Sequence, residues 1–308
     1  MSDVCPDGSP VEFSAEFTEA GVQALRVLLE AVPPEATPRS AQRAAQALNH
    51  SLSTRHGAVL DRCEAVADLF LPPHPQGFAM MHAMNLRPGA APGFKVYLNP
   101  AADDSRSAAD RVEAALDRLG LSVVWPSVLA YARRGFTLDR IVYLSLDLSA
   151  EPDAKVKVYF RHLDITAAEL DATMALGPTH RKGLFPSFCG ELTGVAGALS
   201  VQPPVSSLTF TGALDTPTAV TGYVPLWTYA DHDHQTHDRL YSVLSGLGLP
   251  ADRYSTLTRL LARRPLAAGR GLHTYASLRT DRGQPRVVVY WSPEMHGSNP
   301  APRYRTAG

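Results

Sequence analysis

Two stretches of this chain place lysine and tyrosine side chains at alternate positions, as in a β-strand with one functional face. One stretch carries Lys95 and Tyr97, and the other carries Lys155, Lys157 and Tyr159. Because alternate residues of a strand share a face, ammonium and phenol groups would stand side by side. Only four of the 29 basic residues are lysines, and three of the four belong to these stretches. Compact ammonium groups gathered on one face favour an anionic ligand such as a diphosphate.

Composition excludes several classes of protein. The 308 residues carry a net charge of −1 with dispersed basic residues, which argues against a nucleic-acid partner. The hydrophobic content of 45% suffices for a large core, but no stretch approaches the roughly 18 apolar residues of a membrane span. Three cysteines without CxxC spacing, and a beginning that lacks signal-peptide features, predict a soluble cytoplasmic protein.

Hydrophobic periodicity divides the chain into strand pairs separated by helix pairs, and the unit recurs about every sixty residues. No break in composition separates the units, so one α+β domain is expected over residues 1–308. The predicted strands are Val11–Phe17, Leu25–Glu30, Gly77–Asn85, Gly93–Asn99, Arg140–Leu148, Ala154–His162, Ser206–Gly212, Ala219–Leu226, Leu272–Arg279 and Pro285–Ser292. The predicted helices are Ser40–Arg55, Asp61–Phe70, Ser107–Leu119, Pro126–Arg134, Ala167–Leu176, Pro186–Leu192, His237–Leu247 and Arg253–Arg263.

The two faces of the predicted strands differ in character. One face is rich in Val, Leu and Phe, which suits packing beneath helices. The other face adds Glu12, Arg26, Tyr223, Tyr275 and Tyr290 to the lysines and tyrosines already named. Closure into a barrel removes unpaired strand edges, and a barrel of more than about eight strands leaves space inside. The pattern therefore predicts a ten-stranded antiparallel β-barrel, built from ββαα units and surrounded by helices, with a polar ligand chamber.

Several motifs, in this order, resemble those of one enzyme family. They are Pro10–Ser14, Gly93–Pro100, Lys155–Tyr159 and Thr274–Ser277. The chain resembles the dimethylallyltryptophan synthase-like aromatic prenyltransferases, bacterial members in particular, from about residue 9 to residue 293. The resemblance implies the prenyltransferase barrel known as the ABBA fold. It also implies transfer of a dimethylallyl group from dimethylallyl diphosphate to an indole or tryptophan acceptor, in secondary metabolism such as alkaloid biosynthesis.

The resemblance also implies roles for individual residues. Glu12 would accept a hydrogen bond from the indole N–H and so make the ring more nucleophilic. Cationic side chains would hold the diphosphate, and tyrosines would shield the allyl cation and donate to phosphate oxygens. The cations are Arg26, Lys95, Lys155 and Lys157, and the tyrosines are Tyr97, Tyr159, Tyr223 and Tyr275.

Three positions depart from the family pattern. Thr221 stands where relatives often carry glutamine in Gln-x-Tyr. The proton acceptor has no clean match, and His82 ranks ahead of Arg87 for that role. Only about ten residues precede the first predicted hairpin, so the acceptor end is expected to be more open or to be completed by other elements.

Other functions remain as alternatives. A stretch of aspartates and histidines, Asp231–Asp238, offers metal ligands for a hydrolase, but its place at a helix start predicts capping and a solvated surface. Asp103 and Asp104 do not extend into DDxxD, so no obligatory metal or other cofactor is expected. Nearer alternatives are a phenolic or naphthoquinone acceptor, a geranyl donor, or a non-catalytic ligand-binding barrel. The expected partners are small molecules only, with a monomer or weak homodimer as the assembly.

Overall fold

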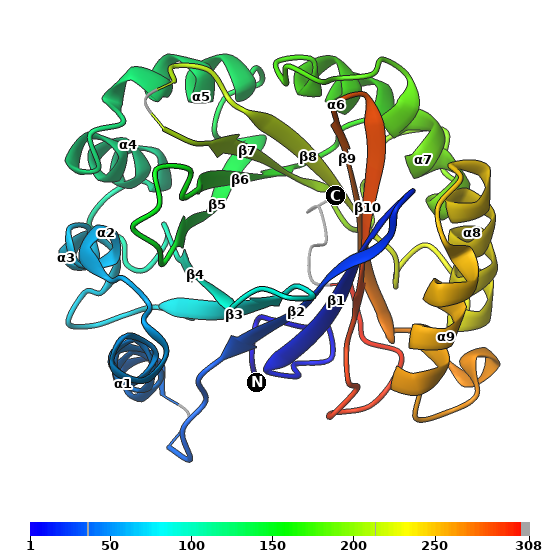
Figure 1. Ribbon diagram of the computed structural model, residues 1–308, viewed down its shortest axis with the longest axis horizontal. Helices are drawn as coiled ribbons and strands as arrows, with labels where there is room; N and C mark the ends of the chain where they lie inside the picture. The colour runs from blue at the N-terminus through cyan, green and yellow to red at the C-terminus, as the bar shows by residue number, and fades with distance from the viewer. Residues whose placement is uncertain (36, 213, 303–308) are drawn as a thin grey trace.

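The computed structural model describes residues 1–35, 37–212 and 214–302, and its centre is a closed antiparallel barrel of ten strands (Figure 1). The sequence prediction of an α+β barrel surrounded by helices is confirmed. The strands are β1 Val11–Thr18, β2 Gly21–Glu30, β3 Met80–Leu86, β4 Gly93–Leu98, β5 Asp139–Asp147, β6 Val156–His162, β7 Val205–Phe210, β8 Ala219–Pro225, β9 His273–Asp281 and β10 Gln284–Trp291.

Each strand pairs with its neighbours in the sequence, and β1 closes the barrel by pairing with β10. The closing register sets Phe13 opposite Trp291. The second and third hairpins are joined by the pairing of β4 with β5, in which Lys95 lies opposite Asp147. A closed sheet exposes no unpaired edge, which explains why strands this long and apolar remain protected from pairing with other chains.

The outward face of the barrel forms the main hydrophobic core together with the helices. The predicted apolar residues Val96, Val158, Leu208 and Val289 are fully buried there. On β8 the absence of a side chain at Gly222 allows α7 to approach, because a Cβ at this position would lie 2.3 Å from a ring carbon of Phe185. Burial of this face beneath helices leaves the opposite face of every strand for the lumen.

Helices cover the barrel on its outside (Figure 1). The first is capped at both ends by the side chain of Thr37, which accepts a hydrogen bond from the Ser40 amide, and by Gly57 at φ 71°. The helices are α1 Pro38–His56, α2 Asp61–Glu64, α3 Ala67–Phe70, α4 Ala108–Arg118, α5 Trp125–Tyr131, α6 Ala167–Met174, α7 Leu184–Thr193, α8 Asp233–Gly246 and α9 Ala251–Leu261, with short 3₁₀ turns at Ser122–Val124 and Leu266–Ala268. Within the described ranges no helix is both long and apolar enough to cross a lipid bilayer.

Two helix predictions need correction. The expected helix Asp61–Phe70 is split into α2 and α3, because Val66 leaves the helical region at φ −116° and ψ 2°. The helix expected to begin at His237 begins at Asp233, since the side chain of His232 caps it by accepting a hydrogen bond from the Gln235 amide at 3.1 Å. The second difference concerns an element end, which is poorly defined by local sequence.

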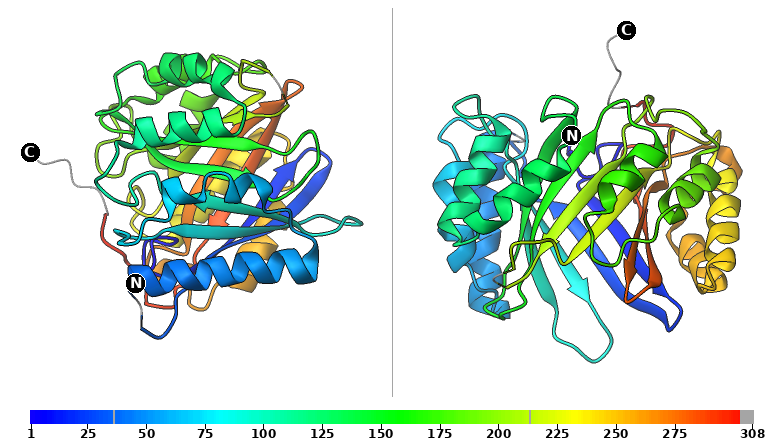
Figure 2. Two further views of the ribbon diagram at one scale, coloured as in Figure 1. Left: turned by 90° about the vertical axis from the view of Figure 1, so that its left-hand side faces the viewer. Right: turned by 90° about the horizontal axis from the view of Figure 1, so that it is seen from above.

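The barrel has two different ends, which Figure 2 shows from the side. All five ββ turns lie at one end, here called the hairpin end, and the strands join their helices at the other, here called the connector end. The N-terminus lies at the connector end. Residues 1–10 fold back there, where the Ser2 hydroxyl donates to Glu30 Oε2 at 2.5 Å and Cys5 is fully buried.

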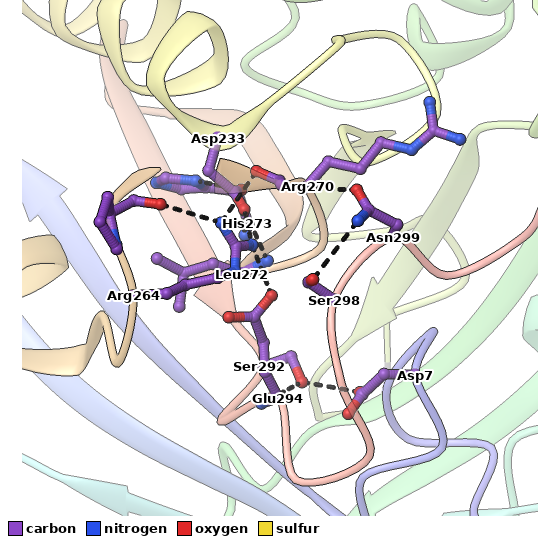
Figure 3. Close-up of polar contacts among 12 residues, drawn as sticks. Asp7, Asp233, Arg264, Arg270, Leu272, His273, Ser292, Glu294, Ser298 and Asn299 are labelled. Atoms are coloured by element: carbon purple, nitrogen blue, oxygen red, sulfur yellow. Dashed lines mark hydrogen bonds and ion pairs between the residues drawn. The ribbon is translucent and has the colours of Figure 1, made fainter. Parts of the chain in front are cut away.

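A strap formed by residues 292–300 fixes the connector end (Figure 3). The guanidinium of Arg264 bonds the carboxylates of Asp233 (2.5 Å) and Glu294 (2.6 Å), and so links the strap to the start of α8. Ser292 donates to Asp7 at 2.8 Å, which ties the same strap to the N-terminal residues. The strap therefore joins the two termini of the barrel into one polar cluster, as Figure 3 shows.

Candidate active site

The barrel lumen contains a cavity of about 660 Å³. Strand alternation positions its walls, since every second residue of each strand points inward. The cavity is lined by all of the sequence-predicted site residues except His82, namely Glu12, Arg26, Lys95, Tyr97, Lys155, Lys157, Tyr159, Tyr223 and Tyr275. The structure thus brings together side chains from most of the strands, although it does not by itself test the role of each.

The hairpin half of the cavity is strongly cationic. Seven basic side chains line it, together with four carboxylates: Glu16 and Asp147 on the strands, and Glu151 and Asp153 between β5 and β6. Arg26 bonds Glu16 at 2.6 Å, and Lys95 bonds Asp147 at 2.8 Å. The seven are Arg26, Arg87, Lys95, Lys155, Lys157, Arg279 and Arg286. The excess of positive charge makes this half a site for a multiply charged anion.

Arg279 and Arg286 were missed by the sequence prediction. They pair in register across the last hairpin, where each follows the inward alternation of its strand. Arg286 bonds Glu16 at 2.9 Å. Burial alone would raise the pKa of Glu16, but the nearby guanidinium groups of Arg26, Arg279 and Arg286 outweigh it and hold that pKa below its usual value. In the sequence, Tyr275, Ser277 and Arg279 occupy alternate positions of one predicted strand, and this alternation places Arg279 on the inward face with Tyr275.

Lys157 lies at the centre of this cationic half. Burial, together with the charges of Lys95, Arg279, Arg26 and Lys155, holds the pKa of Lys157 well below its usual value. Among the described residues no carboxylate forms an ion pair with it. An anion bound here would favour the ammonium form, so ligand binding and proton uptake by Lys157 are coupled.

A belt of tyrosine rings lies next to the cations. Tyr97 contacts Tyr159 with ring centroids 5.6 Å apart, Tyr159 contacts Tyr223 at 5.9 Å, and Tyr223 contacts Tyr290 at 6.2 Å. Tyr143, which the sequence prediction did not include, completes the belt against Tyr97 at 6.3 Å and Tyr159 at 5.9 Å. Burial raises the pKa of Tyr159 well above its usual value, so its hydroxyl keeps its proton. Such faces stabilise a cation while excluding water.

Glu12 lies toward the connector end and is only 6% exposed. Its Oε1 accepts a hydrogen bond from the Thr274 hydroxyl at 2.6 Å, which fixes the carboxyl group against β9. Burial raises the pKa of Glu12 to about 8, despite the opposing effect of this hydrogen bond. A donor placed in the cavity would favour the carboxylate form.

The connector half of the cavity is completed partly by the N-terminal residues. Asp3 and Val4 line it, and Val4 and Cys5 pack in a small apolar cluster with Met81. Leu28 and Tyr97 contact the same cluster from the barrel wall. The expectations for this end were a more open barrel or completion by other elements. Instead, the short segment before β1 itself lines part of this half of the cavity.

His82 does not line the cavity, which corrects the expectation that it accepts the substrate proton. Its side chain points outward from β3 and is 2% exposed, with Nε2 2.9 Å from Asn49 Oδ1 of α1. Burial lowers the pKa of His82 to about 4, so the imidazole is neutral. Met81 occupies the inward position instead. Arg87, the other candidate, lines the cavity, but a guanidinium does not act as a base near neutral pH.

A His82→Ala variant is therefore expected to lose stability rather than chemistry. Removing the ring leaves a void and deprives the buried amide oxygen of Asn49 of its partner, at a cost of about 2–4 kcal/mol in the free energy of unfolding. Urea unfolding measures this loss. Turnover assayed well below the unfolding midpoint should remain near the native value. A folded variant with strongly reduced turnover would contradict this assignment.

The structure also locates two other features singled out in the sequence, Thr221 and the stretch Asp231–Asp238. Thr221 lines the cavity beside Tyr223 on β8 and is 5% exposed. In the stretch Asp231–Asp238, His232 caps α8 as predicted, but the expected solvated surface is wrong in part, because Asp233 and Thr236 are buried. No group of three or more metal-ligating side chains occurs in the part of the chain that the structure describes.

Comparison with known proteins agrees with this geometry. A sequence profile of the tryptophan dimethylallyltransferases matches residues 1–256. The chain belongs to this family. Its members are prenyltransferases, and this assignment makes the chain an aromatic prenyltransferase, as the resemblance implied. A phenol-directed enzyme and a non-catalytic barrel are correspondingly disfavoured.

Solved structures of related enzymes share the whole barrel. A structure of 6-dimethylallyltryptophan synthase from Micromonospora olivasterospora, in complex with DMASPP and Trp, is 31% identical with a TM-score of 0.90 and matches 97% of this chain and 86% of that one. A complex of 5-dimethylallyltryptophan synthase from Streptomyces coelicolor with the same ligands is 32% identical with a TM-score of 0.86, over 99% and 85% of the two chains. PriB in complex with product diphosphate is 30% identical with a TM-score of 0.88, over 99% and 86%.

Proposed function

We propose that this family member transfers a dimethylallyl group from dimethylallyl diphosphate to the ring of an indole acceptor, with tryptophan as the expected substrate. One observation supports this most strongly: a cationic half and a buried carboxyl group, Glu12, share one lumen with a belt of tyrosines, in which Tyr97 and Tyr159 stand on the same strands as Lys95 and Lys157. Complexes of two related enzymes with DMASPP and Trp support the same pair of substrates.

The proposed reaction begins when the C–O bond of the allylic diphosphate breaks and both electrons leave with diphosphate. Lys95, Lys155, Lys157 and Arg26 would stabilise the developing negative charge, assisted by Arg279. Tyr97, Tyr159, Tyr223 and Tyr275 would shield the allyl cation from water and donate to phosphate oxygens, and Tyr143 and Tyr290 extend that wall.

The second step is attack by the arene on the allyl cation. Glu12 would accept the indole N–H hydrogen bond through the carboxylate oxygen that Thr274 does not use. This bond orients the ring and increases its electron density. A C–C bond forms, and the ring carbon then loses its proton to solvent or to the departing diphosphate, since His82 lies outside the lumen.

The function is tested by incubating the protein with dimethylallyl diphosphate and, separately, tryptophan, tyrosine and an indole-containing peptide. We expect a product heavier by one dimethylallyl group, together with stoichiometric diphosphate, from tryptophan. Geranyl diphosphate and a phenolic acceptor serve as comparison substrates. Release of diphosphate with no acceptor would show ionisation without transfer, and no release with any acceptor would refute the enzymatic function.

No obligatory metal is proposed for this reaction, because cationic side chains already surround the diphosphate position. Treatment with EDTA is therefore expected to leave the initial rate of prenyl transfer unchanged. The rate is measured at saturating substrates before and after chelation, with added magnesium as a separate arm. Loss of turnover on chelation, recovered by magnesium, would show that the cationic half is insufficient alone.

We also propose a single domain that acts in the cytoplasm as a monomer or weak homodimer. Cys5, Cys63 and Cys189 are buried free thiols, the state expected in a reducing compartment. Sedimentation at several protein concentrations measures the assembly.

A further inference from the structure

The strand β9 carries one residue more than its partner β10 near the connector end. Between two regular pairs of this ladder, Thr274 and Tyr275 of β9 stand opposite the single residue Tyr290 of β10. The residues on either side, His273 and Ala276, both point outward, where His273 bonds a tyrosine of α9 and Ala276 lies in the hydrophobic core. Residues three apart in a regular strand face opposite sides, so the extra residue forms a β-bulge.

The bulge gives Thr274 a direction that regular alternation would not allow. A regular strand would turn Thr274 outward, because its neighbour Tyr275 lines the cavity. Instead its hydroxyl reaches past β10 and donates to Glu12 Oε1 at 2.6 Å. The side chain of Thr274 is fully buried and contacts Glu12 from outside the cavity. Bulges beside active sites commonly redirect a side chain in this way.

A buried carboxylate, Asp233 at the start of α8, holds the backbone just before the bulge (Figure 3). It accepts hydrogen bonds from the amides of Leu272 at 3.1 Å and His273 at 3.0 Å, and its Oδ1 lies 2.9 Å from Nδ1 of His273. Buried amides in an irregular stretch of a strand need partners outside the ladder. Asp233 supplies them ahead of Thr274, whose carbonyl accepts from the Leu226 amide at 2.9 Å.

Asp233 keeps its charge in this buried position. Burial alone would raise the pKa of Asp233, but hydrogen bonds from His273 and Arg264 outweigh burial and hold that pKa below its usual value. Arg264 also bonds Glu294 of the strap at 2.6 Å. Asp233 bonds the β9 amides directly, whereas Glu294 bonds the guanidinium, so the two carboxylates form a matched pair for comparison.

We propose that the β9 bulge serves to position Glu12: Asp233 holds the bulge, the bulge turns Thr274 toward the lumen, and Thr274 orients the carboxyl group. This inference rests on the proposed function and adds two positioning residues to it. With Oε1 bound to Thr274, the carboxyl group presents its other oxygen to the indole N–H. Asp233, from the stretch of aspartates and histidines at the start of α8, thus acts on the reaction through β9 rather than by contact with substrate.

The first test is the pH profile of Thr274→Val, which removes the hydroxyl and keeps the shape of the side chain. Burial raises the pKa of Glu12 and the Thr274 hydrogen bond opposes this, so loss of the bond should raise the pKa further. We expect the rise of kcat/KM for tryptophan to move about one pH unit upward, which lowers kcat/KM at pH 7 about tenfold. Thr274→Ser should restore the native profile. Thr173→Val, at a buried threonine of α6, is the matched control and should leave it unchanged.

Other ionisable groups near Glu12 are the same in the native protein and in this variant. Those that line the cavity from neighbouring elements are Tyr97 of β4, Arg161 of β6, Tyr275 of β9 and Asp3 of the N-terminal segment. Burial raises the pKa of Tyr97, so the phenol keeps its proton, and the guanidinium of Arg161 keeps its charge. A difference between the two profiles therefore reports the loss of the threonine hydroxyl.

The second test compares Asp233→Asn with Glu294→Gln. Asp233→Asn replaces one accepting oxygen with a donor, so a buried β9 amide loses its partner and the bulge loosens. We expect kcat for tryptophan to fall about 10- to 100-fold, as for a displaced catalytic group, with the KM of dimethylallyl diphosphate unchanged. The same substitution should cause no further loss when added to Glu12→Gln. Glu294→Gln should keep the native kcat.

The outcomes separate this inference from the function on which it rests. Failure of the native protein to prenylate any indole would refute both. Native turnover with an unshifted pH profile in Thr274→Val would refute the positioning role alone. Equal losses in Asp233→Asn and Glu294→Gln, or a further loss on adding Asp233→Asn to Glu12→Gln, would show that Asp233 does not act through Glu12. If Asp233→Asn does not fold, the profile of Thr274→Val and its recovery in Thr274→Ser decide the matter.

Discussion

Replacing Glu12 with glutamine is expected to lower kcat for tryptophan by about 10²-fold or more, because the neutral amide cannot polarise the indole N–H as a carboxylate does. The native carboxyl group has a pKa of about 8, raised by burial. For the free enzyme, kcat/KM should therefore rise as the pH increases through about 8. Glu12→Gln should abolish this rise. Steady-state rates between pH 6 and pH 9.5 measure both effects.

The same substitution separates catalysis from stability. The pKa of Glu12 in the folded state lies above the ordinary value of 4.5. The free energy of unfolding therefore falls as the pH rises from 4.5 to about 8, and this loss remains at higher pH. Glu12→Gln should therefore be at least as stable as the native protein at pH 9, despite its lower activity. Glu113→Gln is the control, since Glu113 is exposed on α4 and does not line the cavity. A pH rise that persists in Glu12→Gln would assign the titration to another group.

Replacing Lys157 with alanine is expected to reduce kcat/KM for dimethylallyl diphosphate by about 10²-fold, as for the loss of one fixed donor to a developing anion. Lys157 is buried among four other cations that lower its pKa, so its charge is unfavourable until an anion binds. Thermal unfolding of the empty variant should accordingly be unchanged or shifted upward. Rates measured against dimethylallyl diphosphate concentration show the functional loss.

Lysine elsewhere in the chain provides the control for this effect. Lys182 is exposed between α6 and α7 and does not line the cavity, so Lys182→Ala should behave as the native protein does. Lys95→Ala should resemble Lys157→Ala, although it also leaves Asp147 without its 2.8 Å ion pair. If all three variants lost activity equally, the positions of the lysines in the lumen would not be the cause.

The strands and lumen were predictable because the signal for them is repeated. Each hairpin alternates apolar and polar residues, and the alternation in one hairpin agrees with that in the next. Lys95, Lys157 and Tyr159 therefore faced inward as expected. Arg279 and Arg286 obey the same alternation, but no family motif marked them, so their role in the cavity emerged only from the closed geometry.

The failure of the His82 prediction has a definite physical origin. A shift of one residue reverses which face a side chain occupies. In β3 methionines stand on both faces, with Met80 packed outward near Asn49 and Met81 turned inward, so hydrophobicity does not identify the lumen side. The sequence also did not predict that residues 1–10 complete the connector half, because a short segment without helix or strand shows no hydrophobic periodicity.

The seam between β1 and β10 has a consequence for how the protein is made. Glu12 and Thr274, which share a hydrogen bond, are 262 residues apart, and β1 finds its second partner only in the last strand. During synthesis the outer edge of β1 therefore stays unpaired until almost the entire chain has left the ribosome. Contacts this distant in sequence form slowly, and exposed edges invite wrong pairing in the meantime. The carboxyl group of Glu12 thus gains its buried environment last, so we expect a nascent chain to be inactive until translation is nearly finished.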